Sequence, residues 1–363
     1  MSEIFNYISY NDIIHVDNYN NSPLFYAFSE VKFRTHISSH MNFFTPIGLH
    51  NNKIISLTNK QFSFLVQKYI HFLGNEYAIE LKNTYDKINS TLSNDILTIN
   101  EDVFQFFDYE SINGTGHSYD LMFYLLYFYK TNNLTSKLLV VESNNKYYNS
   151  TLELIKKYFG VEYIYIKPYK TYLFKKFYCT RSYQNIFFNE VKNFININLI
   201  QPIINKYEGM NEKYYDNIIK IKYKNNNSID RLNTTYEKTH LFNKFCFEKK
   251  IFDLNDIDDN EELKIFLINK AKNLIIAWGS NYYININYYL SNTQDKFISI
   301  IFHNNILDES IFISKINDNT FKQNMPSQYC SNITNQVYNN FIFKGEKLEN
   351  ISNIDDFVLR TNI

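Results

Sequence analysis

Residues 137–166, KLLVVESNNKYYNSTLELIKKYFGVEYIYI, decide the fold class of this chain. The segment opens with Lys137–Glu142, a short apolar run of the kind found in buried parallel strands. An amphipathic helix is predicted over Asn149–Phe159, with Gly160 as its C-terminal stop, and Val161–Ile166 predicts a second strand. Because a strand, a helix and a strand of these lengths form a βαβ unit, the sequence predicts an α/β protein.

The same alternation continues on both sides of this unit and then recurs. Around it we predict strands at 95–100, 103–107 and 172–179, a buried helix at 118–130 and a helix at 184–200 that Pro202 closes. From about residue 210 onward we predict strands at 217–223, 251–254, 273–277 and 297–302, with helices at 236–249 and 261–272. The helix at 149–159 is predicted to be capped by Asn149 or Ser150. Residues 1–93 give a weaker pattern, in which a helix is predicted at 61–79 and strands and loops at 36–55.

Two series of alternating strands and helices predict two α/β units with parallel sheets. A chain of 363 residues is also long for a single hydrophobic core. We therefore expect an N-terminal domain over residues 1–205 and a C-terminal domain over residues 206–363. In parallel sheets of this kind, ligands bind beyond the carboxyl ends of the strands.

Composition narrows the classes of function. Lys and Arg together number 37, as do Asp and Glu, so the chain lacks the net positive charge that favours binding to nucleic acid. An apolar fraction of 45% and an aromatic fraction of 18% argue for folded cores and against disorder. The abundance of Asn, Ile, Lys, Tyr and Phe matches AT-rich codons, as in a large cytoplasmic DNA virus or a parasite, so single aromatic residues carry little functional weight.

The cysteines and the N-terminus point to a cytoplasmic protein. Cys179, Cys246 and Cys330 are far apart and form no CxxC pair or zinc spacing, and an odd, low count suits a reducing compartment. No run reaches about 18 apolar residues, and the first residues lack the pattern of a signal peptide. We expect no membrane span and, for a viral protein, a location in the host cytoplasm.

A glycine-containing segment, Asn113-Gly114-Thr115-Gly116-His117-Ser118-Tyr119-Asp120, is the first functional signal. Two of the eight glycines of the chain permit a tight turn there, and a helix that follows points free N–H groups at the same place. This pattern predicts a site for a polar or anionic ligand. His117 and Asp120, three residues apart, share a helix face, so His117 is a candidate acid–base group that Asp120 orients. The alternative is a capping turn in which Ser118 or Asp120 stabilises the helix start.

A second turn, Trp278-Gly279-Ser280-Asn281, follows the strand predicted at 273–277. A glycine there lets backbone amides approach a phosphate, although an ordinary strand-to-helix turn has the same pattern. Lys222 ends the first strand of the second unit, and Arg231 and Lys238 follow it. Cations at that position can hold a diphosphate, and the alternative is solvated surface charge.

Other chemical signatures are absent from the sequence. It contains no P-loop, no complete GxGxxG and no HExxH, GxSxG or kinase motif. Its short acidic pairs, such as Asp256-Ile257-Asp258, are common by chance, so no metal site is predicted.

In this order, the motifs resemble a known family. Residues 113–120 with the following LMFYLLYF resemble the N-G-H-x-x-x-D segment of glycosyltransferase family 61. Residues 269–281, NKAKNLIIAWGSN, resemble its C-terminal A-x-x-I-h-x-x-G-x-x-x-x-N segment, and Lys222, Arg231 and the helix at Glu261-Glu262-Leu263 fall in the expected order between them. The match spans roughly residues 95–305.

This resemblance implies a GT-B-like fold, in which two Rossmann-like domains face a central cleft. It implies an inverting transfer of a sugar from a nucleotide-sugar donor, which we expect to be UDP-linked, to a hydroxyl of a glycan or protein acceptor, without a metal or other cofactor. The implied catalytic residues on the acceptor side are His117 and Asp120. The implied donor-binding residues are Gly114, Gly116, Lys222, Arg231, Gly279, Ser280 and Asn281.

Two alternatives stay open. Many family members carry His before the C-terminal glycine, where this chain has Trp278. Eukaryotic members also enter the secretory pathway, for which this chain shows no signal. An inactive relative that keeps the fold as a binding or scaffold protein is therefore one alternative. The other is a different nucleotide-ligand enzyme such as a methyltransferase, supported by Glu142 at the end of the strand after the glycine turn.

We predict that His117→Ala and Asp120→Ala each lower turnover by about 10²-fold or more, the usual contribution of a positioned acid–base group. Their thermal unfolding midpoints should stay near that of the wild type. The rate of nucleoside diphosphate release from the bound donor measures the effect. Full activity in both variants would remove these residues from the acceptor side.

Overall fold

The computed structural model describes residues 13–15, 25–37, 44–56, 75–107, 115–180, 188–208, 216–223, 235–236, 238–257, 260–277, 289–291, 297–301, 313–317, 320–323 and 337–339. It has the α/β architecture that the sequence predicts. The chain divides into two compact units, Met1–Tyr183 and Gln184–Ile363. The boundary that we expected after residue 205 falls inside helix α7 (Gln201–Glu208).

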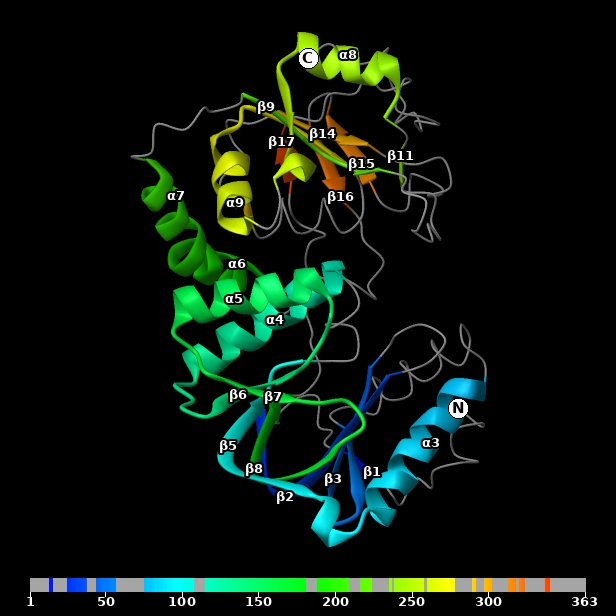
Figure 1. Ribbon diagram of the computed structural model, residues 1–363. Helices are drawn as coiled ribbons and strands as arrows, with labels where there is room; N and C mark the ends of the chain where they lie inside the picture. Colours follow the sequence, from blue (N-terminus) through cyan, green and yellow to red (C-terminus); the bar gives the residue numbers. More distant parts are fainter. Residues whose placement is uncertain are drawn as a thin grey trace. The chain divides into compact units, whose positions relative to one another are not determined.

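The first unit is built on an eight-stranded mixed sheet with the order β1-β4-β3-β2-β8-β5-β6-β7 (Figure 1). Its strands are β1 (Ile13–His15), β2 (Phe25–Ile37), β3 (Phe44–His50), β4 (Lys53–Ser56), β5 (Leu97–Gln105), β6 (Lys137–Val141), β7 (Tyr163–Ile166) and β8 (Thr171–Thr180). Its helices are α3 (Asn75–Ser90), the short 3₁₀ turn η2 (Ser93–Asp95), α4 (Thr115–Thr131) and α5 (Lys146–Phe159).

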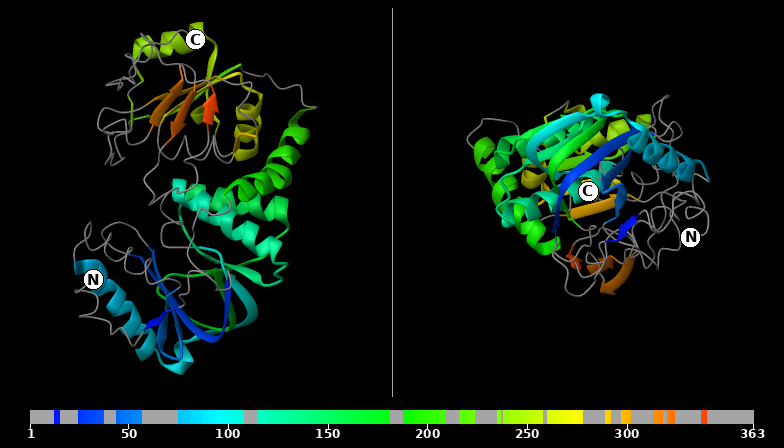
Figure 2. Two further views of the ribbon diagram at one scale, coloured as in Figure 1. Left: turned by 180° about the vertical axis from the view of Figure 1, so that it is seen from behind. Right: turned by 90° about the horizontal axis from the view of Figure 1, so that it is seen from below.

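One half of this sheet is the predicted parallel part. β8, β5, β6 and β7 are mutually parallel, and α4 and α5 connect β5 to β6 and β6 to β7. Figure 2 shows α4 and α5 together on this part of the sheet, whereas α3 lies against β2 and β3. The strand β6 is buried from Leu138 to Val141, as its apolar sequence predicts.

The ends of α5 confirm one predicted signal and correct another. Gly160 adopts φ +59° and donates its N–H to the Lys156 carbonyl at 3.1 Å, so it is the C-terminal stop that we expected. The helix begins at Lys146, however, and Asn145 Oδ1 accepts the Tyr148 N–H at 3.3 Å. The prediction of a cap at Asn149 or Ser150 was therefore wrong, because Asn145 supplies an acceptor one turn earlier.

The other half of the first sheet corrects our expectation of a parallel sheet. β2 pairs antiparallel with both β3 and β8, and β3 pairs antiparallel with β4. A two-residue turn, Asn51 and Asn52, joins β3 to β4, and it is too short to contain a crossover helix. Both residues have positive φ, 51° and 61°, the conformation of the hairpin turns that Asn favours. Of the helix predicted at 61–79, residues 61–74 lie outside the described residues, and α3 begins at Asn75.

The second unit contains a parallel sheet with the order β12-β9-β13-β14. The strands of the second unit are β9 (Asn217–Lys220), β10 (Lys222–Tyr223), β11 (Thr235–Tyr236), β12 (Ile251–Asp253), β13 (Asn273–Ala277), β14 (Phe297–Ile301), β15 (Ile313–Asn317), β16 (Thr320–Gln323) and β17 (Val337–Asn339). Its helical segments are α6 (Phe188–Ile195), the π-helical turn η4 (Asn196–Ile200), α7, α8 (His240–Glu248), the 3₁₀ turn η5 (Leu254–Asp256) and α9 (Glu261–Lys270). β10 and β11 form a parallel pair, and β15, β16 and β17 form an antiparallel sheet.

The helices of the second unit also differ from expectation at one point. We predicted that Pro202 ends a helix, but α6, η4 and α7 form one continuous helical run through it. The Gln201 N–H donates to the Asn196 carbonyl five residues back, as in a π turn. Because a π turn is wider than an α turn, it accommodates a proline ring and its missing N–H directly after it.

One hydrophobic cluster of the second unit lies between the parallel sheet and α8. Ile219 of β9, Ile275 of β13 and Ile221, which directly follows β9, pack against Phe242 and Phe245 of the helix. Ile219 and Ile221 alternate with Lys220, which therefore faces the opposite side of the sheet.

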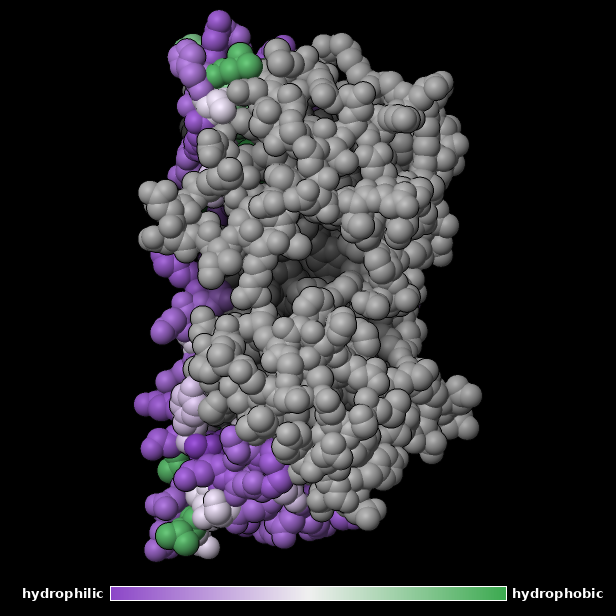
Figure 3. Space-filling view, turned by 90° about the vertical axis from the view of Figure 1, so that its right-hand side faces the viewer, coloured by the Kyte–Doolittle hydropathy of each residue, from purple (hydrophilic) through white to green (hydrophobic). Residues whose placement is uncertain are grey.

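Among the described residues that Figure 3 colours, hydrophilic ones predominate and hydrophobic ones are isolated. Among the residues whose side chains the structure describes, the exposed large apolar ones are Leu92, Leu97, Tyr165, Tyr169, Ile197, Leu241 and Phe247. None of the helices that the structure describes combines the length and the apolar character that a membrane span requires.

We predict that Phe242→Ala lowers the free energy of unfolding by about 3–5 kcal/mol, because this side chain is 2% exposed and fills the core of the second unit. Phe247→Ala on the same helix is the matched control. Its side chain is 85% exposed, so its effect should stay within about 0.5 kcal/mol. Urea unfolding measures both, and equal effects would contradict the assignment of the core face of α8.

Candidate functional site

The topology of the second unit defines a candidate binding position. From β9 the chain passes through α8 to β12 on one side, and then through α9 to β13 on the other side of β9. The direction of winding thus reverses between β9 and β13. In open α/β sheets, ligands bind outside the carboxyl ends of the strands at such a switch point.

Two of the predicted donor-binding segments continue from these two strands. Lys222 is the first residue of β10, two positions after β9 ends at Lys220. β13 ends at Ala277, and Gly279, Ser280 and Asn281 follow outside the described residues. Ile276 of β13 lies opposite Lys220 of β9 in the sheet. The two segments therefore follow strand ends that are neighbours at the carboxyl edge.

Arg231 lies outside the described residues, within the segment that joins β10 to β11. The two ends of this segment are close together, because Lys222 pairs with Thr235.

The remaining predicted residues belong to the first unit. Gly114 lies outside the described residues, and α4 begins directly after it at Thr115. Gly116 is thus within the first turn of α4 and not in a turn ahead of the helix, as we had expected. Ser118 and Asp120 are the fourth and sixth residues of α4, so the alternative in which either caps the helix is wrong. His117 and Asp120 remain three residues apart on one helix, as predicted.

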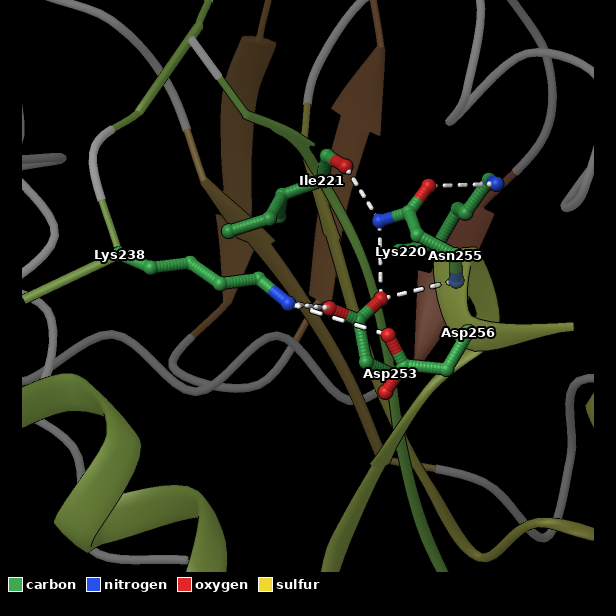
Figure 4. Close-up of polar contacts among 6 residues, drawn as sticks. All are labelled: Lys220, Ile221, Lys238, Asp253, Asn255 and Asp256. Atoms are coloured by element: carbon green, nitrogen blue, oxygen red, sulfur yellow. Dashed lines mark hydrogen bonds and ion pairs between the residues drawn. The ribbon is translucent and has the colours of Figure 1, made fainter. Parts of the chain in front are cut away.

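A chain of polar contacts crosses the carboxyl edge of β9 and β12 (Figure 4). Lys238 Nζ lies 3.2 Å from Asp253 Oδ2 and 3.9 Å from Asp256 Oδ1. Asp253 Oδ1 accepts both the N–H of Asn255 at 2.9 Å and its Nδ2 at 2.8 Å. Asn255 Oδ1 in turn accepts Lys220 Nζ at 2.8 Å, which completes the chain of contacts.

Two groups at this edge, Lys220 and Tyr223, have shifted pKa values. Burial lowers the pKa of Lys220, and the charge of Lys264 lowers it further. Burial also raises the pKa of Tyr223, as does the carboxylate of Asp253. Lys238 Nζ lies 4.3 Å from the centre of the Tyr223 ring, a cation–π contact. Perturbed groups of this kind gather at functional sites, although structural ion pairs also produce them.

An asparagine network anchors the far end of the segment that follows β13. Asn269 on α9 donates to the Tyr289 carbonyl at 2.7 Å. Its Oδ1 accepts the Ser291 N–H at 2.9 Å and the Ser291 hydroxyl at 2.7 Å. Asn269 therefore ties Tyr289 and Ser291 to α9.

Sequence reasoning missed Lys220, Asn255 and Asn269 as members of this region. The stretch Asp253-Leu254-Asn255 carries a turn signal, since Asp at a strand end accepts the N–H two residues on. That signal predicts a turn and does not show that Asn255 reaches β9. Among the described residues, no group of three or more His, Cys, Asp or Glu could hold a metal ion.

The comparisons give no relative on which to rest an assignment: neither a scan against protein-family models nor a search of curated proteins matches the chain.

We predict that Asn269→Ala frees the segment around Tyr289 and Ser291. Loss of these hydrogen bonds should cost about 1–3 kcal/mol and should speed exchange of the Ser291 amide about tenfold or more. Hydrogen exchange read by mass spectrometry tests this, with the exposed Asn243→Ala as the control. Unchanged exchange at Ser291 in Asn269→Ala would mean that other contacts hold the segment.

Proposed function

We propose that this protein is an inverting glycosyltransferase that binds a nucleotide sugar at the carboxyl edge of the second unit. The observation that carries the proposal is the switch point between β9 and β13, because both strands lead into predicted donor-binding segments. The resemblance to glycosyltransferase family 61 supports the same reading, and the GT-B arrangement of two Rossmann-like domains is part of the proposal. The UDP-linked donor, the glycan or protein acceptor, the metal-independent reaction and the cytoplasmic location remain predictions.

The proposed reaction needs two kinds of group. The bond from the anomeric carbon to the diphosphate oxygen breaks, and a bond to the acceptor oxygen forms on the opposite face of the sugar. The nucleoside diphosphate leaves with the bonding electron pair, and cations such as Lys222 and Arg231 would stabilise its growing charge. The proton of the acceptor hydroxyl passes to a general base, for which His117 is the candidate and Asp120 its orienting partner.

A second candidate function rests on the first unit. Its parallel strands have the order β7-β6-β5-β8, so the winding reverses between β5 and β8, and the glycine segment follows β5. Glu142, directly after β6, is exposed. An acidic residue at the end of the second strand binds ribose hydroxyls in dinucleotide-binding proteins of this topology. This arrangement favours a nucleoside cofactor such as S-adenosylmethionine in the first unit.

A thermal-shift screen of the full chain separates these functions. The ligands are UDP, GDP, CMP and their sugar conjugates, with S-adenosylmethionine alongside and EDTA present. A ligand at about one hundred times its Kd stabilises the native state by about 2.7 kcal/mol, so a true donor raises the melting temperature measurably. We expect a shift with one nucleotide sugar and a smaller shift in Arg231→Ala.

The other outcomes contradict the proposal in different ways. No shift with any sugar nucleotide at millimolar concentration would favour an inactive binding or scaffold protein. A shift with S-adenosylmethionine alone would favour the methyltransferase. An unchanged shift in Arg231→Ala would remove Arg231 from the donor site but leave the transferase proposal standing.

A further inference from the structure

The ammonium group of Lys220 is held in a fixed direction at the switch point. Asn255 Nδ2 donates to the Ile221 carbonyl and to Asp253 Oδ1, each at 2.8 Å, so both of its N–H donors are engaged. These two acceptors set the orientation of the amide, and its Oδ1 therefore faces Lys220 Nζ. The lysine is thus positioned by contacts from two strand ends, β9 and β12 (Figure 4).

The charges at this edge are compensated unequally. Lys238 pairs with Asp253 and Asp256, and Lys264 pairs with Glu261 at 2.8 Å. Lys220 has a neutral amide as its hydrogen-bond partner, and within the described part of the chain no carboxylate lies at ion-pair distance from its Nζ. Its charge is therefore left for an anionic ligand to compensate. Burial and the charge of Lys264 lower its pKa, and the more distant carboxylates of Glu261 and Asp253 offset part of this change.

The neighbouring helix terminus is not an alternative position for that anion. Glu261 and Glu262 occupy the first turn of α9, where their charges already interact favourably with the helix dipole. Glu261 pairs with Lys264, and Glu262 pairs with Lys206 of α7. A phosphate there would meet two carboxylates, which repel it.

We propose that Lys220 is a further phosphate-contact residue, which binds a diphosphate oxygen of the ligand at the switch point between β9 and β13. This inference rests on the proposed function for the identity of the ligand, and it adds a residue that the sequence motifs did not indicate. A charge-assisted hydrogen bond from this ammonium group supplies both affinity and direction to the diphosphate.

Calorimetric titration of the full chain with inorganic pyrophosphate and, separately, with UDP tests the role of Lys220. Lys220→Gln should raise the Kd of both probes about tenfold or more, the usual loss for a hydrogen bond to a charged group. Lys220→Arg keeps the charge and should bind both more tightly than Lys220→Gln. Lys244→Gln is the matched control, because it removes the same charge from an exposed position on α8 and should leave both affinities unchanged.

A second measurement needs no variant and covers the case in which Lys220→Gln fails to fold. Pyrophosphate should slow the trace acetylation of Lys220 by acetic anhydride in the native protein, read by mass spectrometry. The exposed Lys249 serves as the internal reference. Equal acetylation of Lys220 with and without bound pyrophosphate would overturn the inference.

The outcomes distinguish this inference from the proposed function. If the wild type binds UDP and Lys220→Gln binds it equally well, the inference fails and the transferase proposal stands. If pyrophosphate binding depends on Lys220 but no sugar nucleotide binds, the phosphate contact stands and the transferase proposal fails. If the wild type binds neither probe, both fail.

Discussion

The reversal of chain direction at β9 is the constraint on which the candidate site depends. Parallel strands need crossover connections, and these pack on both faces of the sheet when the chain winds first one way and then the other. Once β12 and β13 lie on opposite sides of β9, the connections diverge and the carboxyl ends of the strands are left open between them. The position of the site therefore follows from the strand order, before any side chain is considered.

Side chains then give that position its chemical character. Asp253 ends β12, caps η5 and pairs with Lys238, so its carboxylate is committed to holding the edge together. The same carboxylate fixes Asn255, which in turn directs Lys220. An edge fixed by hydrogen bonds in this way is preorganised, so a ligand that meets it does not have to order the cation first. The proposal that a nucleotide-sugar donor binds at the carboxyl edge of the second unit rests on these contacts, because they hold a cation in place for an anionic ligand.

The sequence predicted the parts of the fold that depend on local pattern. The buried strand β6, the Gly160 stop and the alternation around β9, β12 and β13 follow from apolar periodicity and single-residue conformational preference. It did not predict the antiparallel half of the first sheet, because the turn residues Asn51 and Asn52 do not stand out in a chain rich in asparagine. It also did not predict the helix through Pro202, because that helix depends on a π turn. For the candidate site, Lys222 and the turn at 278–281 were predicted from motifs, and their roles stay predictions. Lys220 and Asn255 were not, because their contact joins residues 35 positions apart and exists only once β9 and β12 are adjacent.

The most direct test of this account is hydrogen exchange of the full chain with and without saturating UDP, resolved by mass spectrometry. Ligand contacts slow the exchange of the amides that they cover or order. The account predicts slower exchange at residues 219–223, 254–257 and 274–277, with little change in the β15–β17 sheet. Protection confined to the first unit, or none at the carboxyl edge of β9 and β13 despite measurable binding, would contradict the placement of the site.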